Sequence, residues 1–243
     1  MSDLKYGLEL EQIGHYKEAL KVYKSIDLKL LSKMEQTEVQ RSIGACLFYI
    51  KNYNEALEQF QLILDKHEIP DHIKTDVMDC INICYLYSGA EKRSICYFKK
   101  KTEKELSDKS LFWANWYVAQ GDQILKDFVK AELYYTKAYN IAKDSGADKS
   151  SFFLLYLITA KILNNKNYEA NVLMRQYVEE YESESNNGLF TILDGILLLE
   201  KDYQIGFKEF NEGIKEAQEK NWIENVDLGN LLFNIVKDRD ISR

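Results

Sequence analysis

NYNEALEQF, residues 52–60, sets an aromatic residue at Tyr53, a small residue three positions later at Ala56 and an aromatic residue four positions further on at Phe60. The same pattern returns along the chain at spacings close to 37 residues. It reads Tyr16-Ala19-Tyr23, Phe128-Ala131-Tyr135 and, in weaker form, Tyr203-Gly206-Phe210. Self-similarity at a period of about 20 to 50 residues is the sequence signature of repeat architectures. The chain is therefore predicted to be an array of repeats in which each unit packs on its neighbours.

The composition favours helices over strands. Hydrophobic residues make up 46% of the 243 residues and charged residues 29%, which supplies apolar surface for a continuous core and charge for solubility. The 1 proline and 11 glycines leave little of the turn chemistry that a many-stranded sheet needs. Leu, Glu, Lys, Ala and Gln all favour helix. The sequence therefore predicts an almost wholly helical protein.

The charge balance bears on the partners. A net charge of -7 argues against nucleic acid as a partner, because nucleic-acid binding needs a basic face. The basic run Lys99-Lys100-Lys101 with Lys104 is interpreted as a solvated helix end, since Glu103 and Glu105 adjoin it. Nothing in the sequence approaches about 18 uninterrupted apolar residues, and residues 1–6 do not resemble a secretory signal. We therefore expect a cytoplasmic protein with neither a nucleic-acid nor a membrane partner.

Cysteine and histidine indicate no site for a metal or for catalysis. The four cysteines are Cys46, Cys80, Cys84 and Cys96. All fall in expected helices and are interpreted as small buried hydrophobic residues. His67 and His72 stand on either side of Pro70, which does not place them on one helical face as metal ligands. The chain holds no Gly-rich phosphate loop, no His-Glu-x-x-His and no Gly-x-Ser-x-Gly motif. We expect no cofactor, no metal and no enzyme activity.

The second unit has the most complete set of signals. Gly44 lies in its expected first helix, Tyr53 and Ala56 follow the turn, and Phe60 lies in the second helix, with Pro70 ending the unit. The first unit has the same order in Gly7, Tyr16, Ala19 and Tyr23. This pattern resembles the tetratricopeptide repeat (TPR). The resemblance implies an all-α, right-handed superhelical solenoid of antiparallel helix pairs, in which the small residue of the first helix lets the second approach and the turn aromatic fills the corner.

Six helix pairs are expected in a single array over residues 1–243. Their approximate bounds are 1–35, 36–70, 71–107, 108–147, 148–184 and 185–220, followed by a C-terminal capping helix and tail at 221–243. In the third unit Glu91 replaces the corner aromatic. In the fifth unit Tyr168 is taken as the corner residue, which leaves Asn171 and Arg175 in the two later slots and breaks the pattern. The polar stretch 182–188 is interpreted as a loop between units, with a hinge as the alternative.

The TPR resemblance also implies a binding surface, because such arrays bind in a concave groove lined by the first helix of each pair. The groove candidates for peptide or partner binding are Arg41, Phe48, Asp79, Asn82, Trp113, Trp116, Gln120, Gln123 and Tyr156. Rings suit the side chains of a ligand, and amides suit its backbone. Which of Trp113 and Trp116 faces the groove stays open. Arg41 and Asp79 have the alternative of pairing with each other.

Three functions are left open. The first is a non-catalytic adaptor that holds a protein or short peptide in the groove. The second follows from residues 130–142, which look like a repeat of the bacterial peptide-pheromone receptors, the Rap-type and related regulators. That resemblance implies a peptide-responsive regulator, here lacking the N-terminal output domain, since the first repeat is entered by about Leu4. The third is a structural subunit, including a homodimer, that assembles through its terminal helices if Leu231, Leu232 and Ile235 are exposed.

Overall fold

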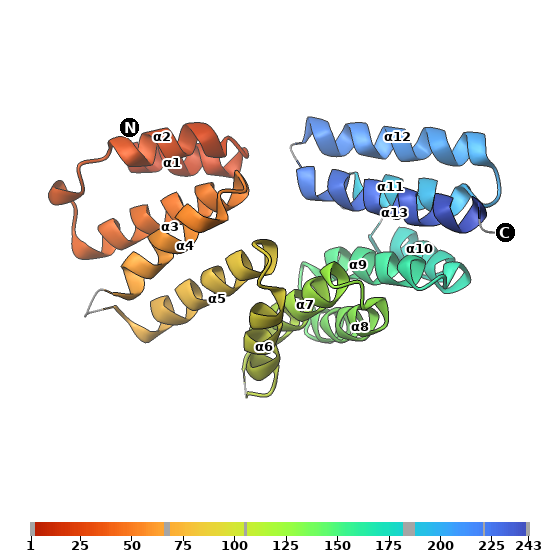
Figure 1. Cartoon of the computed structure of the whole chain (residues 1–243), viewed down its shortest axis with the longest axis horizontal. Coiled ribbons are helices and arrows are strands. Elements are labelled where there is room, and N and C mark those ends of the chain that lie inside the picture. The colour runs from red at the N-terminus through yellow and green to blue at the C-terminus, as the bar shows by residue number, and fades with distance from the viewer. Residues whose placement is uncertain (1–2, 66–68, 105, 182–187, 221, 242–243) are drawn as a thin grey trace. The chain divides into compact units, whose positions relative to one another are not determined.

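The computed structural model describes residues 3–65, 69–104, 106–181, 188–220 and 222–241, and all regular structure in this part of the chain is helical (Figure 1). The α-helices are α1 (Asp3–Gln12), α2 (Tyr16–Ser25), α3 (Lys33–Tyr49), α4 (Tyr53–Leu64), α5 (Asp71–Tyr87), α6 (Glu91–Thr102), α7 (Asp108–Ile124), α8 (Phe128–Asp144), α9 (Ser150–Leu163), α10 (Asn167–Tyr181), α11 (Leu189–Leu198), α12 (Tyr203–Glu219) and α13 (Ile223–Ile241), with a 3-10 turn at Leu28–Leu30. The predicted all-α class is confirmed.

The chain divides into two compact units, Met1–Tyr97 and Phe98–Arg243, which we call the N-unit and the C-unit. Consecutive helices pack on each other in both: α1 on α2 and α3 on α4 in the N-unit, α7 on α8, α9 on α10 and α11 on α12 in the C-unit. Of the predicted loop or hinge at residues 182–188, all but Gly188 lies outside the described residues, as do His67 and Glu105.

Six described turns join the two helices of a pair, and five of them contain one residue in the left-handed conformation; the α11–α12 turn contains none. These residues are Gly14, Lys51, Gly89, Lys126 and Asn165, with φ between 60° and 89°. A left-handed residue just after a helix lets the chain reverse while its amide still bonds back to the helix. They stand 37, 38, 37 and 39 residues apart, and each precedes the first residue of the next helix by two positions. The repeat is therefore a property of the backbone, and the third unit keeps it despite Glu91.

The turn register corrects the fifth unit. Two positions after Asn165 comes Asn167, so Asn167 and not Tyr168 takes the corner slot. Tyr168 is 80% exposed. Ala170 and Met174 then occupy the small and the second large position of the pattern, and both are buried.

The predicted breaks at Asn171 and Arg175 are therefore wrong. The fifth unit keeps the pattern and lacks only the corner aromatic, because Tyr168 stands one position too late and its ring points to solvent. In the sixth unit Tyr203 begins α12 as predicted, yet it is 56% exposed and stacks on Phe207 at a centroid distance of 5.8 Å. Corner aromatics thus fill the turn less completely in the last two pairs.

The small and second aromatic positions of the pattern make the contact between paired helices. The buried members are Ala19, Tyr23, Ala56, Phe60, Ala131 and Tyr135. A Cβ atom on Gly44 of α3 would stand 2.7 Å from the ring of Phe60 on α4. In the α11–α12 pair, a Cβ atom on Gly195 would stand 2.3 Å from the backbone nitrogen of Phe210. The close approach that the TPR resemblance implies is confirmed at both sites.

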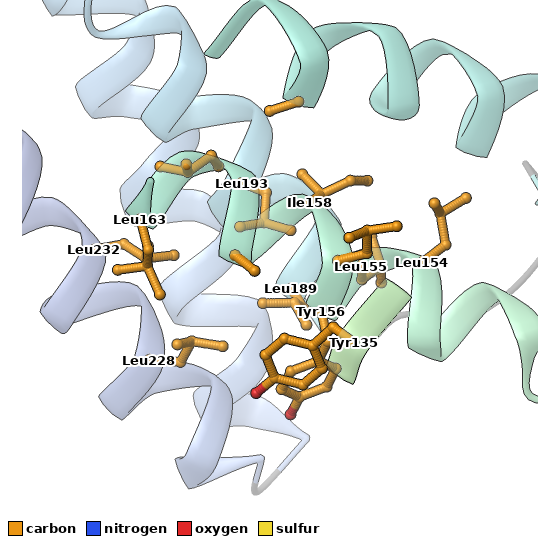
Figure 2. Close-up of a cluster of buried hydrophobic side chains, with 14 of the residues drawn as sticks. Tyr135, Leu154, Leu155, Tyr156, Ile158, Leu163, Leu189, Leu193, Leu228 and Leu232 are labelled. Carbon is orange, nitrogen blue, oxygen red and sulfur yellow. The ribbon is translucent and has the colours of Figure 1, made fainter. Parts of the chain in front are cut away.

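Each unit has its own hydrophobic core. The N-unit core runs from Leu10 to Cys84 and the C-unit core from Phe112 to Val236. In the C-unit, α13 packs on α9, α11 and α12, and Figure 2 shows Leu228 and Leu232 of α13 beside Leu163 of α9. The last helix is thus part of a core.

The same packing bears on assembly through the terminal helix. Leu232 is fully buried and Ile235 is half-buried, while Leu231 is 39% exposed. Between Val226 and Val236, the apolar side chains of α13 mostly face inward.

The cysteines divide into two groups. Cys46 and Cys84 are buried as predicted, and burial raises the pKa of each thiol to about 12. Cys80 is half-buried, and burial raises its thiol pKa to about 11. Cys96 is exposed on α6, so its interpretation as a buried hydrophobic residue is wrong.

Candidate functional site

The C-unit brings together five of the predicted site residues on two helices. Trp113, Trp116, Gln120 and Gln123 recur every three or four residues along α7, so they share one side of that helix. Tyr156 reaches this side from α9: its ring centroid lies 5.3 Å from that of Trp116, with the ring planes nearly perpendicular at 87°. Edge-to-face contacts of this kind are favourable. We call these five residues the α7–α9 face.

Aromatic rings surround Trp116. The rings of Trp113 and Phe152 each lie 5.6 Å from the ring of Trp116 and 5.7 Å from each other, and Tyr117 lies at 5.0 Å. Trp116 is only 8% exposed, whereas Trp113, Tyr117 and Phe152 are half-buried. Trp116 is therefore the deeper of the two tryptophans, and Trp113 is the one with more contact to solvent.

Polar groups of the face lie next to the aromatic rings. Gln123 accepts a hydrogen bond at its Oε1 from the Tyr135 hydroxyl, at 3.1 Å. The ring of Tyr135 lies 5.7 Å from that of Tyr156, and Figure 2 shows the two tyrosines side by side with their hydroxyls pointing the same way. A continuous set of contacts thus leads from Trp116 through both tyrosines to Gln123, and Gln120 lies on α7 between its two ends.

Four polar groups of the face have no partner among the described residues. The indole N–H of Trp116 is buried without an acceptor. Gln120 is 7% exposed and its carboxamide forms no hydrogen bond, and the same holds for the Nε2 amide of Gln123 and the Tyr156 hydroxyl. A buried polar group left unpaired costs about 1 to 3 kcal/mol; of these four only the indole N–H of Trp116 is fully buried, and solvent reaches the other three.

The electrostatics of the face are set by burial and one carboxylate. Burial raises the pKa of Tyr156, and the negative charge of Glu224 in α13 raises it further. Within the described chain, no Lys or Arg side chain lies over a ring of the face. The face is therefore neutral with an acidic neighbour.

Asp122 also lies near the end of α7 but belongs to a different side of the helix. One of its carboxylate oxygens is 3.9 Å from the ammonium of Lys99. Burial raises the pKa of Asp122, and Lys99 partly opposes that shift. The ammonium of Lys99 also stands 5.1 Å from the centroid of the Tyr134 ring. One lysine of the basic run is thus engaged by α7 and α8.

The other four predicted residues lie in the N-unit and have separate surroundings. Arg41 is exposed and forms no ion pair within the described chain, so the alternative pairing with Asp79 is absent. Asp79 accepts a hydrogen bond from the Tyr97 hydroxyl at 2.8 Å. Phe48 is half-buried, and its ring centroid lies 5.6 Å from that of Tyr87.

Asn82 occupies a packing position. It stands nine residues before the start of α6, as Gly44 stands nine residues before the start of α4. Its side chain is 4% exposed and donates to the carbonyl of Met78, at 2.8 Å. Asn115 of α7 makes the equivalent bond to Leu111. The structure therefore ties the amide nitrogen of Asn82 to its own helix.

Two residues that sequence reasoning did not select belong to the surroundings of the face. Phe152 contacts both tryptophans, and Tyr117 contacts Trp116 and Trp113. Phe152 precedes Tyr156 by four positions, a spacing that places two side chains on the same side of a helix. That spacing could have identified Phe152, since α9 was already an expected first helix.

The described residues contain no group of three or more His, Cys, Asp or Glu side chains placed to hold a metal ion. None of the helices that the structure describes is long and apolar enough to cross a membrane.

Paired helices, a repeated left-handed turn and glycine contacts between helices define a TPR-like repeat fold. No protein-family model matches the chain, and no relative is found among curated protein sequences. Among solved structures, the apo form of RapI superposes with a TM-score of 0.68 at 14% identity, over 99% of this chain and 97% of RapI. A Rap protein complexed with competence and sporulation factor superposes with a TM-score of 0.71 at 13% identity, over 98% of this chain and 74% of the Rap chain.

Two further structures share the fold. A tetratricopeptide repeat protein from Parabacteroides merdae gives a TM-score of 0.66 at 15% identity, over 97% of this chain and 83% of that protein. PlcR of Bacillus thuringiensis, in complex with the peptide PapR7 and DNA, gives a TM-score of 0.51 at 15% identity, over 96% of this chain and 73% of the PlcR chain. The predicted TPR-like fold and the predicted resemblance to Rap-type proteins are both confirmed.

Proposed function

We propose that this protein is a non-catalytic scaffold that holds a peptide, or an extended segment of another protein, on the α7–α9 face. The observation that carries the proposal is the coincidence of clustered rings with unpaired, nearly buried amides on one side of α7. The free amide groups of Gln120 and Gln123 are not among the fully buried unpaired atoms, so they reach the surface and are available to a ligand.

A peptide fits this chemistry. Each residue of a peptide carries one backbone donor and one acceptor, and a glutamine carboxamide can pair with both. The half-buried rings of Trp113 and Phe152 provide rigid apolar area of the kind that is enriched where proteins bind each other. Gln120 would bond the ligand backbone and the rings would hold a side chain.

The comparisons support the same class of ligand. PlcR was solved with the peptide PapR7 and a Rap protein with competence and sporulation factor, and both have the fold of this chain. The similarity to RapI extends over 97% of that protein. This favours a second candidate function, a regulator whose peptide shifts the protein between two conformations. Small-angle X-ray scattering separates the two: a peptide that changes the radius of gyration supports the regulator, and an unchanged curve supports the adaptor.

The proposal is tested by selecting random heptapeptides on the immobilised protein and measuring their affinity by fluorescence polarisation. Gln120→Ala is expected to weaken the selected peptides about 5-fold, the effect of losing one hydrogen bond of about 1 kcal/mol. Because Gln120 is unpaired in the free chain, the variant should unfold at the same temperature as the wild type.

Gln218→Ala is the matched control, since Gln218 is exposed on α12 and its side chain makes no bond with the described residues. It should bind as the wild type does. Failure to select any peptide that distinguishes Gln120→Ala from Gln218→Ala contradicts the proposal.

A further inference from the structure

We propose that the inner part of the α7–α9 face is a pocket for an uncharged carboxamide, the side chain of an asparagine or glutamine in the bound peptide. Its oxygen would accept from the indole of Trp116, and its NH₂ group would donate to an acceptor of the same face. The inference rests on the proposed function and adds the chemical identity of one side chain that the ligand must carry.

The first argument is the polarity of the unpaired groups. The indole of Trp116 can only donate a hydrogen bond, and its N–H is buried without an acceptor. Gln123 has its Oε1 engaged by the Tyr135 hydroxyl, so the part of its carboxamide that remains is the Nε2 donor. The buried indole donor of Trp116 therefore requires an acceptor from the ligand.

The second argument is charge. A carboxylate would be an acceptor, but no described cation lies over the rings and the negative charge of Glu224 already acts on Tyr156. A second negative charge in a buried, uncompensated position is strongly unfavourable. A ligand ammonium or guanidinium is equally unsuited, because it has no acceptor to offer the N–H of Trp116. The acceptor should be neutral.

The third argument separates a carboxamide from a lone carbonyl. Gln120 has a free carboxamide oxygen and Tyr156 has an unpaired hydroxyl, and both can accept. A carboxamide supplies an oxygen for the donors and an NH₂ group for these acceptors. A backbone carbonyl can only accept, and a hydroxyl must use one oxygen for both roles, whereas a carboxamide places its acceptor and its donor on two separate atoms.

Entry of the carboxamide requires a side chain to move. The Trp116 nitrogen has no contact with solvent in the free chain. Trp113 and Phe152 pack against its ring and are only half-buried, so they are the rings that can turn aside. In the free protein the Trp116 N–H is unpaired, and in the complex it would donate a hydrogen bond to the ligand; this new hydrogen bond favours binding.

The test uses the selected heptapeptides and the Trp116→Phe variant, which keeps a ring and removes the N–H. Trp116→Phe should weaken the peptides about 10-fold, as loss of a desolvated hydrogen bond does. Because Trp116 belongs to the C-unit core, the smaller ring also lowers the melting temperature, and the affinities are compared well below both unfolding transitions. An indole that serves only the core would lower the melting temperature and leave the affinity unchanged. Trp222→Phe, at an exposed tryptophan outside the face, should change neither quantity.

The peptides give the second measurement. Each should contain one Asn or Gln whose change to the isosteric acid, or to Leu, lowers affinity about 10-fold or more. The inference is overturned if that position prefers Asp, Glu, Lys or Arg, or if Trp116→Phe binds as tightly as the wild type while Gln120→Ala does not. If no peptide depends on Gln120, the proposed function fails and the pocket fails with it.

Discussion

Three glycines differ only in what a single methyl group would meet. At Gly229 the nearest atoms are side-chain carbons of Ile192 and Ile214 at 3.0 Å, and at Gly44 they belong to the ring of Phe60 at 2.7 Å. At Gly195 the obstacle is the backbone nitrogen of Phe210 at 2.3 Å. Alanine favours helix by about 1 kcal/mol over glycine, so Gly229→Ala should be nearly neutral. Gly44→Ala should cost about 1 kcal/mol, because a ring can shift, and Gly195→Ala about 2 to 4 kcal/mol, because a backbone cannot.

Urea denaturation measures the order of the three variants. Gly229→Ala is the control for the intrinsic effect of the substitution, since it lies in the same unit as Gly195. A Gly195→Ala variant as stable as Gly229→Ala would show that α11 and α12 are further apart than the structure places them.

Individual residues also show which features of the structure could be predicted from the sequence and which could not. Gly44, Ala56 and Phe60 were identified because their roles depend only on neighbours within the repeat. The corner position of the fifth unit was assigned to Tyr168 instead of Asn167 because an aromatic residue is expected there. The repeat length itself varies by one or two residues, so a shift of one position could not be recognised from the spacing. The sequence did not predict how deeply Trp116 is buried, because its burial depends on contacts with Phe152 and Tyr156 of another helix.

Among the helices, one carboxylate joins α8 to α9 and to the turn that precedes α10. Glu132 of α8 lies 2.8 Å from the ammonium groups of both Lys161 and Lys166 and accepts from the amide of Asn164 at 2.7 Å. Burial alone would raise the pKa of Glu132, but these hydrogen bonds outweigh it and lower the pKa below the ordinary 4.5. The charged form therefore stabilises the folded state above pH 4.5, and that contribution is lost as the pH falls through the lowered value.

Glu132→Gln should lower the free energy of unfolding by about 2 to 4 kcal/mol at pH 7, because it leaves two lysines with less compensation in a partly buried site. The difference from the wild type should shrink in acid, where the wild type also carries a neutral carboxyl group. Glu212→Gln is the control: its pair with Lys208 is exposed, and such pairs contribute about 0 to 1 kcal/mol. An equal loss in both variants, or a loss independent of pH, contradicts the role of this network.

For the whole molecule, the separation of the cores predicts how the chain unfolds. The buried residues of the N-unit core run as far as Cys84, and those of the C-unit core begin at Phe112. The sequence predicted one continuous array because its repeat spacing hardly changes at the third unit. It could not show that the buried side chains divide into two cores, since this depends on which side chains meet in three dimensions.

Tryptophan fluorescence can observe one unit alone, because Trp113, Trp116 and Trp222 all lie in the C-unit. Ile63 of α4 and Ile158 of α9 are both fully buried, one in each core. Replacing either by Ala should cost its unit about 2 to 5 kcal/mol. Ile158→Ala should therefore shift the fluorescence midpoint in urea, whereas Ile63→Ala should shift only part of the circular dichroism transition and leave the fluorescence midpoint in place. Equal fluorescence shifts for the two variants would mean that the two cores unfold as a single cooperative structure.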